Sequence, residues 1–437
     1  MQRALRIAVS TVAVLGIAAC DTARQNAVPA ATIAENTPYF KSSRNAFEQQ
    51  ILAQPQLAAA RKTTQARALA IVELDAARAV QLGVSGNAGF TDDSDPSGPA
   101  PLVSVSATAT KLLSDGGRLD AQKQVAEIAI AQARLEYALQ GNQFIGQVLD
   151  ALVTRNTARA TIAVIDKNLA AYAQRAPQIN AAATQGVLTN SDLIEIRSVK
   201  SKIESQRLEA RLAQRTAQSQ LAQLLTPAAR KTLQTRFSRA TGRNPKGAPN
   251  FQAEALRLGG VSLAAQAEAA ALRTTSDVSA ITRLTMPATD SANAGVFVGL
   301  SWSWSVLDGG ASDATARRLQ LERESADLAR KDVIQGGDLA AQGLAIAQAT
   351  AGERRALLRD RIALSKSRLQ ELETLLRAGR ADVASIAREL LAGAEAEVQL
   401  ATLSAEVAQQ QIDAFSARGA TCALVDMCHL FMPATRK

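Results

Sequence analysis

The segments Leu113-Ser114-Asp115-Gly116-Gly117 and Val306-Leu307-Asp308-Gly309-Gly310 repeat one short pattern at two places in the chain. The two Asp-Gly-Gly triplets lie 193 residues apart, the difference between positions 308 and 115. Without a gap, the same offset aligns further identical residues: Asp120 with Asp313, Ala133 with Ala326, Leu135 with Leu328, and Gly186 with Gly379. A pattern that keeps its phase over this length indicates two copies of one structural unit.

Each copy opens with two segments in which apolar residues alternate with small polar ones. The expected β-hairpins cover residues 80–112 and 278–306, and the last strand has the clearest apolar face: Val296, Val298, Leu300, Trp302 and Trp304. Segments of about 9–11 residues with one apolar and one small polar face are typical of transmembrane β-strands. A buried strand of a soluble sandwich is the alternative, but Ser and Gly would give it a thin second layer. We therefore expect lipid on one face and water on the other.

Each hairpin is followed by a long helical pattern, expected over residues 116–183 and 310–377. The first contains no proline before Pro177, and the second contains none. A helix of roughly 65 residues at 1.5 Å per residue is about 100 Å long, which suits a coiled coil rather than a globular core. We call each of these long helices a rod. After the first rod we expect a turn over residues 184–191 and a return helix over 192–225. After the second rod we expect a turn over residues 378–382 and a return helix over 383–416.

These patterns divide the chain into a first repeat at 79–225, a connector with a helix at 226–277, a second repeat at 278–417 and a tail at 418–437. Residues 226–251 are rich in Pro, Gly and basic residues, so they are expected to be irregular. The tail contains Cys422 and Cys428, which can close a small disulfide loop in an oxidising compartment. A metal site that uses both cysteines and His429 is the alternative. It lacks a fourth ligand and the usual close spacing, so no metal is expected.

The N-terminus has the features of a bacterial targeting segment. Arg3 and Arg6 precede the apolar residues 7–17, and Ile17-Ala18-Ala19-Cys20 is similar to the lipobox of bacterial lipoproteins. Residues 1–19 are therefore expected to be a signal peptide and Cys20 the lipidated first residue of the mature chain; an ordinary secretory signal is the alternative. Residues 20–78 are expected to form a lipidated tether followed by helices interrupted at Pro55.

The composition narrows the class of protein further. Aromatic residues make up only 3% of the chain, which is too few for several ordinary globular cores and suits long helices packed through small side chains. The formal charge of +9 is spread along helices among Asp and Glu, so no nucleic-acid surface is expected. The single histidine lies beside Cys428, and Gly259-Gly260 and Gly336-Gly337 lack the Lys-Ser/Thr of a phosphate loop. We therefore expect neither an enzyme nor a cofactor.

Four strands cannot close a barrel, and an open sheet edge is not tolerated in lipid. The chain is therefore expected to oligomerise: two copies would supply eight strands and three copies twelve. The long helices would then continue from the barrel as a hollow coiled-coil cylinder.

The sequence resembles the TolC-like outer-membrane efflux proteins through the duplicated Leu/Val-Ser/Leu-Asp-Gly-Gly segments at constant phase. The resemblance covers essentially the whole mature chain. It implies a homotrimeric, mainly α protein with a 12-stranded transmembrane barrel in outer-membrane lipid, continued by an α-helical tunnel into the periplasm. It further implies a passive exit duct of a tripartite efflux or type I secretion system, with a periplasmic adaptor (membrane fusion) protein and an inner-membrane pump or ABC transporter as partners. Both copies lack the proline that the family usually has at the strand-to-helix junction, which leaves the geometry of that junction open.

The resemblance also implies sites at the helical turns. Gly186-Val187-Leu188 and Gly379-Arg380 are similar to the tips through which the family meets its adaptor; the alternative is that the glycines only form ordinary turns. The family's periplasmic gate uses charged residues near the second tip, where Arg377 and Asp382 lie.

A second functional hypothesis comes from Asp21. An Asp directly after a lipidated cysteine favours retention at the inner membrane in enterobacterial lipoproteins. This keeps open a lipid-anchored, non-conducting helical interaction protein of the periplasm, whose alternating segments would be soluble hairpins.

Overall fold

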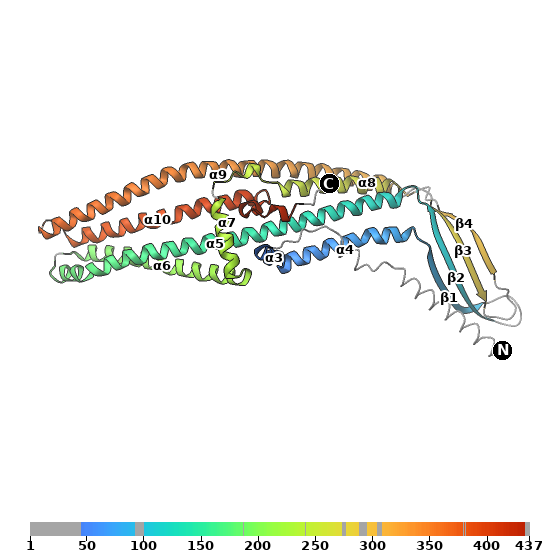
Figure 1. The fold of residues 1–437 in the computed structure, drawn as a ribbon, viewed down its shortest axis with the longest axis horizontal. Helices are drawn as coiled ribbons and strands as arrows, with labels where there is room; N and C mark the ends of the chain where they lie inside the picture. Colours follow the sequence, from blue (N-terminus) through green and yellow to red (C-terminus); the bar gives the residue numbers. More distant parts are fainter. Residues whose placement is uncertain are drawn as a thin grey trace.

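The computed structural model describes residues 45–91, 100–186, 188–240, 242–272, 277–287, 295–303, 308–378, 380 and 382–432. This part of the chain is elongated, with a four-stranded sheet at one end and two helical hairpins that extend to the other end (Figure 1). The fold is mainly α with a small β part, as the sequence predicted. The proposed signal segment, Cys20, Asp21, Val187, Trp304 and Gly379 lie outside the described residues.

The described elements follow the chain in this order: α3 (Ala46–Leu52), α4 (Pro55–Ala77), β1 (Gln81–Thr91), β2 (Ala100–Ser114), α5 (Arg118–Thr184), α6 (Asn190–Leu224), α7 (Pro227–Arg239), the 3-10 turn η1 (Pro245–Gly247), α8 (Phe251–Ala271), β3 (Asp277–Pro287), β4 (Gly295–Ser303), α9 (Ala311–Arg377), α10 (Val383–Ser416), and the short turns η3 (Thr421–Val425) and η4 (Cys428–Leu430).

The four strands form one antiparallel sheet in the order β1-β2-β3-β4. The register places Leu82 opposite Ala109, Ala109 opposite Thr282, and Thr282 opposite Val298. Because side chains alternate between the two faces of a sheet, this register brings the apolar sets of all four strands to one face. Strands β1 and β4 are the two edges of the sheet.

The two longest helices, α5 and α9, each contain 67 residues. Near the sheet, α5 packs between α4 and α8, and α8 packs against α9. Toward the far end, α5 packs between α6 and α10, and α10 packs against α9. The helices therefore form a wall in which α5 is internal along its length and α9 lies at one edge. Pro177 lies inside α5, where it removes one backbone hydrogen bond without ending the helix.

The connector is more ordered than the sequence predicted. Residues 226–251 were expected to be irregular, but α7 occupies 13 of them. Thr226 caps this helix by accepting a hydrogen bond from the backbone N–H of Ala229, and Pro227 lies in the first turn, where proline is tolerated. Ala229 and Leu233 are buried. The local start signal and the buried face outweigh the Pro- and basic-rich composition, so this expectation was wrong.

The buried side chains form two clusters rather than one. The middle cluster collects most of the buried aromatic side chains of the described residues and joins α3, α5, α7, α10 and the C-terminal segment, with Leu149, Phe415 and Phe431 among its members. The tip cluster lies where the two hairpins meet and includes Ile179, Leu188 and Leu390. In Figure 1, α7 lies across the long helices near the middle of the molecule. No helix in the described part of the chain is both long enough and apolar enough to cross a bilayer.

Candidate functional site

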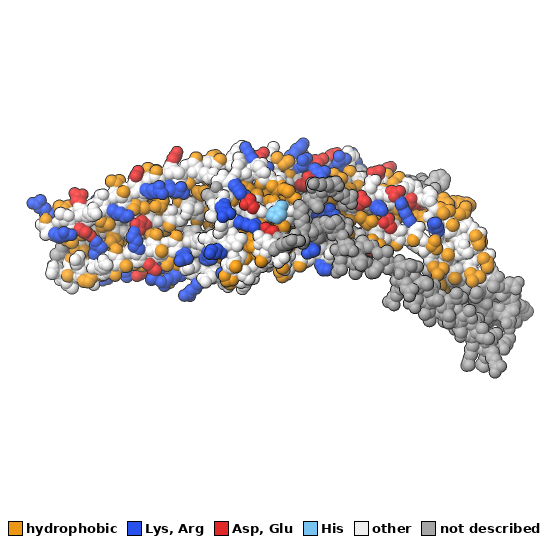
Figure 2. All heavy atoms as spheres, in the orientation of Figure 1, with side chains coloured by type: hydrophobic (Ala, Val, Ile, Leu, Met, Phe, Trp, Pro, Cys, Tyr) orange, Lys and Arg blue, Asp and Glu red, His pale blue; other side chains and the backbone are white. Residues whose placement is uncertain are grey.

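The two faces of the sheet differ in chemistry. We call the first the apolar face; its described members include Leu82, Val84, Val105, Val296, Val298, Leu300 and Trp302. Trp302 is 77% exposed and Val298 73% exposed, because no described part of the single chain covers them. Figure 2 shows hydrophobic side chains gathered at the sheet end, whereas Lys and Arg side chains spread over the helices. A contiguous exposed apolar surface of this kind indicates contact with lipid or with another protein.

The opposite surface, the polar face, consists mainly of small hydroxyl and glycine residues. Its members include Gly83, Ser85, Ser106, Thr108, Thr110, Ser279, Arg283, Gly299 and Ser301. The hydroxyl oxygens of Ser85 and Ser106, on neighbouring strands, lie 2.8 Å apart and share a hydrogen bond. A face of this composition is suited to water, and the pair of faces matches the alternation of a membrane barrel strand.

The first strand-to-helix junction is built by Asp115, Gly116 and Gly117. One carboxylate oxygen of Asp115 accepts a hydrogen bond from the N–H of Gly117 at 3.1 Å, and the other accepts from the N–H of Leu119 at 2.7 Å. Both glycines have positive φ angles, 62° and 88°, which favour glycine. Asp115 therefore satisfies N–H groups that would otherwise be free at the start of α5.

The second junction repeats this geometry. Asp308 accepts from the N–H of Gly310 at 3.0 Å and from the N–H of Ser312 at 2.9 Å, and Gly309 and Gly310 have φ angles of 64° and 82°. Hydrogen bonds from Ser312 and Gly310 hold the pKa of Asp308 below its ordinary value. The two triplets thus perform the same structural task in the two copies.

An ion pair connects the first long helix with the second β-hairpin of the same chain, at the sheet end of the molecule. Arg118, at the start of α5, lies 2.7 Å from Asp277, at the start of β3. Both side chains are partly buried. The pair fixes the first long helix against the second hairpin.

The first helical tip is held by local hydrogen bonds and by burial. Gly186 has a φ of 73°, and the N–H of Leu188 donates to the carbonyl of Ala182, which closes the end of α5. Leu188 is buried in the tip cluster. Thr189 and Asp192 form a reciprocal capping box at the start of α6, and the hydrogen bonds from Thr189 lower the pKa of Asp192.

The second tip shows the same kind of closure. The N–H of Arg380 donates to the carbonyl of Leu375 at 2.9 Å, and Asp382 caps α10 by accepting from the N–H of Ser385 at 2.5 Å. Arg377, Arg380 and Asp382 are exposed, and none has an ion-pair partner among the described residues. The structure thus brings these three charged residues together at the end of one hairpin and gives Asp382 a capping role.

Ion pairs join the two helical hairpins on the sheet side of the tips. Arg388 of α10 lies 3.8 Å from Asp192 and 3.4 Å from Glu195, both on α6. Glu397 of α10 lies 2.9 Å from Lys167 of α5. Burial raises the pKa of Glu397, but hydrogen bonds from Lys167 and Asn168 outweigh it and leave the pKa below its ordinary value. These contacts hold the hairpins side by side.

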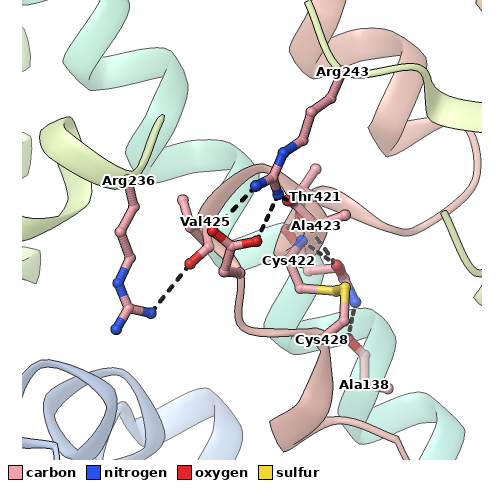
Figure 3. The surroundings of a disulfide bond; sticks show 10 residues. Ala138, Arg236, Arg243, Thr421, Cys422, Ala423, Val425 and Cys428 are labelled. Atoms are coloured by element: carbon pink, nitrogen blue, oxygen red, sulfur yellow. Dashed lines mark hydrogen bonds and ion pairs between the residues drawn. A yellow bond between two sulfur atoms is a disulfide. The ribbon is translucent and has the colours of Figure 1, made fainter. Parts of the chain in front are cut away.

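The C-terminal segment forms a compact structure that we call the clasp, residues 418–432. Cys422 and Cys428 are joined by a disulfide in its centre (Figure 3). With both thiols in the bond, neither cysteine is available as a thiolate ligand for a metal. His429 lies 3.6 Å from Glu48 instead.

Three side chains from other elements hold the clasp. Asn142 of α5, which is almost fully buried, accepts from the N–H of Cys422 at 2.7 Å and also bonds Thr421. Figure 3 shows two arginines reaching the clasp: Arg236 of α7 donates to the carbonyl of Val425 at 3.1 Å, and Arg243 donates to the carbonyl of Ala423 at 2.6 Å. Sequence reasoning missed these residues. The only signal for Asn142 was the pair Gly141-Asn142 inside a helical stretch that mixes apolar residues with glutamines.

The comparisons with known proteins agree with this architecture. No family model matches the chain, and no curated protein matches its sequence. Among solved structures, the chain is similar to the outer membrane protein VceC from Vibrio cholerae, with a TM-score of 0.70 and 14% identity over 86% of this chain and 95% of that one.

Two further outer membrane channels give comparable matches. For CmeC from Campylobacter jejuni the TM-score is 0.69 with 10% identity, covering 85% of this chain and 84% of that one. For the open state of MtrE from Neisseria gonorrhoeae it is 0.66 with 12% identity, covering 86% and 88%. The chain therefore has the fold of these outer-membrane channel proteins, and the mainly helical fold with a small β part that the TolC-like resemblance implied is confirmed.

Proposed function

We propose that this protein is the outer-membrane duct of a tripartite export system, through which solutes leave the periplasm passively. One observation carries the proposal: a single chain joins a sheet with one exposed apolar face and one polar face to helical hairpins of 67-residue rods. At 1.5 Å per residue, each rod is about 100 Å long. Such a molecule is suited to crossing a membrane with its strands and reaching through an aqueous compartment with its helices.

The edges of the sheet support a trimer. Strands β1 and β4 each present one unpaired side within the described chain, and unpaired backbone groups are too costly to leave in lipid. Pairing β4 of one copy with β1 of the next removes every edge once the ring closes. Three copies give a 12-stranded barrel, wide enough to leave a water-filled bore between the polar faces.

The edges of the helical wall support the same assembly. Six exposed apolar residues on α9 are spaced alternately by 7 and 11 residues: Leu321, Leu328, Leu339, Ile346, Leu357 and Leu364. A repeat of 18 residues is five turns of 3.6 residues, so every second member of the set lies directly in line, and the members between them are offset by only about 20° around the helix. All six residues therefore form one narrow stripe along α9. On the opposite edge, α6 exposes Ile194, Leu208 and Leu212. We assign these stripes to contacts between copies, because apolar lines of this length are otherwise left in water.

The remaining parts of the proposal concern location and partners. A lipid on Cys20 would anchor the trimer in the outer membrane, with the helices extending into the periplasm. The tips at Gly186-Val187-Leu188 and Gly379-Arg380 would meet a periplasmic adaptor, and an inner-membrane pump or ABC transporter would supply the energy. Arg377 and Asp382 would contribute to a gate at the same end. The hydrogen bonds that close the two tips and their position at the end of the molecule farthest from the sheet support this assignment (Figure 1).

The mass of the purified protein in detergent, combined with conductance in planar lipid bilayers, tests this function. We expect a trimer that raises bilayer conductance, and a fraction of the cellular protein in the outer membrane. A monomer that neither inserts nor conducts would contradict the duct and favour the lipid-anchored, non-conducting interaction protein instead. Labelling with radioactive fatty acid, with Cys20→Ser as the control, tests the anchor separately.

A further inference from the structure

Arg283 is the one charged residue on the central part of the polar face in the described strands. It lies on β3, opposite Thr108 of β2 and Phe297 of β4. Thr108 in turn lies opposite Gly83 of β1, so the row across the sheet reads Gly83, Thr108, Arg283, Phe297. The Arg283 side chain is exposed, and no hydrogen bond or ion pair to it occurs among the described residues.

The other charged residues of the described strands do not share this situation. Asp277 is on the same face, at the helix end of β3, but it is paired with Arg118 at 2.7 Å. Lys111 lies opposite Ala280, which places it on the apolar face near the helix end of β2. A long cationic side chain can reach polar surroundings from that position. Among the described strand residues, Arg283 is therefore the charged residue of the polar face whose charge is not paired.

The residues opposite Arg283 on β2 and β4 are uncharged, so they do not neutralise its charge. The ring of Phe297 leans over Gly299, where a Cβ atom would lie 2.6 Å from the ring. Gly299 is opposite Ile281, so an apolar surface lies on the helix side of Arg283. Low-dielectric walls beside a charge focus its field into the adjacent water.

We propose that Arg283 forms a ring of three positive charges in the bore of the barrel and makes the duct prefer anionic solutes. This inference rests on the proposed trimeric duct. Twelve strands about 4.8 Å apart, tilted by about 40°, close a barrel with a backbone radius of about 12 Å. The Arg283 side chains reach inward from that wall, so most of the bore lies within about one Debye length, roughly 8 Å, of a guanidinium group. Rings of Arg or Lys select anions in other pores.

The experiment measures the reversal potential of the full-length trimer in planar bilayers under a potassium chloride gradient. We expect Arg283→Gln to lower the chloride-to-potassium permeability ratio relative to the wild type, and Arg283→Glu to lower it further. Lys111→Gln removes the same charge from the apolar face of a neighbouring strand and should leave the ratio unchanged. Trimer mass in detergent confirms that each variant has assembled.

The possible results distinguish a failure of the proposed anion preference from a failure of the proposed duct. A wild-type protein that forms no conducting trimer contradicts the proposed duct, and the inference falls with it. A conducting trimer whose permeability ratio is the same in wild type, Arg283→Gln and Arg283→Glu overturns the inference alone. An equal decrease in Lys111→Gln also overturns it, because the effect would then not depend on the face of the sheet.

Discussion

At the scale of single residues, packing requires one glycine of the long helices and does not require another. A Cβ atom added to Gly141 of α5 would lie 2.2 Å from the Phe431 ring of the clasp, whereas one added to Gly352 of α9 would meet nothing within 4 Å. Phe431 is itself buried in the middle cluster, so its ring has little room to move. Gly141 is therefore required by packing across distant parts of the chain, and Gly352 is not.

We expect Gly141→Ala to destabilise the protein by about 1–3 kcal/mol, the usual cost of overpacking a core. Gly352→Ala should be neutral or stabilising by about 0.5–1 kcal/mol, because alanine is the better helix former. Thermal unfolding of the two variants in the same detergent provides the measurement. Equal melting temperatures for the two variants would mean that the contact between Gly141 and Phe431 does not limit packing.

At the scale of elements, the clasp depends on contacts that bridge great distances in sequence. The hydrogen bond between Cys422 and Asn142 spans 280 residues. Closing a disulfide loop of about seven residues is expected to contribute about 2 kcal/mol by restricting the unfolded chain. The double variant Cys422→Ala, Cys428→Ala should therefore melt about 2 °C below the oxidised wild type, and a reductant should lower the melting temperature of the wild type but not that of the variant. Identical melting of wild type and double variant would show that the disulfide does not stabilise the clasp.

Two substitutions on β4 test whether the apolar face of the sheet contacts lipid and the polar face contacts water. Val298→Arg places a charge on the apolar face, where Arg near a bilayer midplane costs about 2–4 kcal/mol in a barrel, so less protein should reach the outer membrane. Ser301→Arg places the same side chain on the polar face and should leave membrane insertion intact while changing conductance. Outer-membrane fractions and bilayer recordings provide the readouts. Equal loss of insertion in both variants would indicate a strand buried on both sides and would contradict the duct.

The same elements show what the sequence could and could not predict. The rods α5 and α9 were predictable because neither is broken by proline before its last turns, and the β-strands because their alternation is regular. The helix α7 was missed because residues 226–251 taken together are rich in Pro, Gly and basic residues, although Thr226 and Pro227 are local start signals. The clasp and its partners Asn142, Arg236 and Arg243 follow no period. Such long-range hydrogen bonds arise from the fold and leave no pattern in a single sequence.

At the scale of the whole molecule, the sheet and the tips lie at opposite ends of the rods (Figure 1). A local change at a tip should therefore leave the distant sheet unaffected, unless it unfolds the chain. Gly186 has a φ of 73° and Gly242, in the connector, a φ of 86°; a Cβ atom at either position meets nothing within 4 Å. The two glycines thus form a matched pair with the same backbone strain at different places in the fold.

This pair tests whether the tips are the docking site for the adaptor. Valine at a positive φ costs roughly 1–2 kcal/mol at either position, so Gly186→Val and Gly242→Val should lower stability to a similar extent. Only Gly186→Val deforms the proposed contact surface, so it alone should weaken cross-linking to the adaptor and reduce export, with trimer and outer-membrane abundance unchanged. If both variants lose cross-linking equally, the effect is one of stability. If Gly186→Val retains full cross-linking and export, docking occurs elsewhere and Gly186 serves only to close the end of α5.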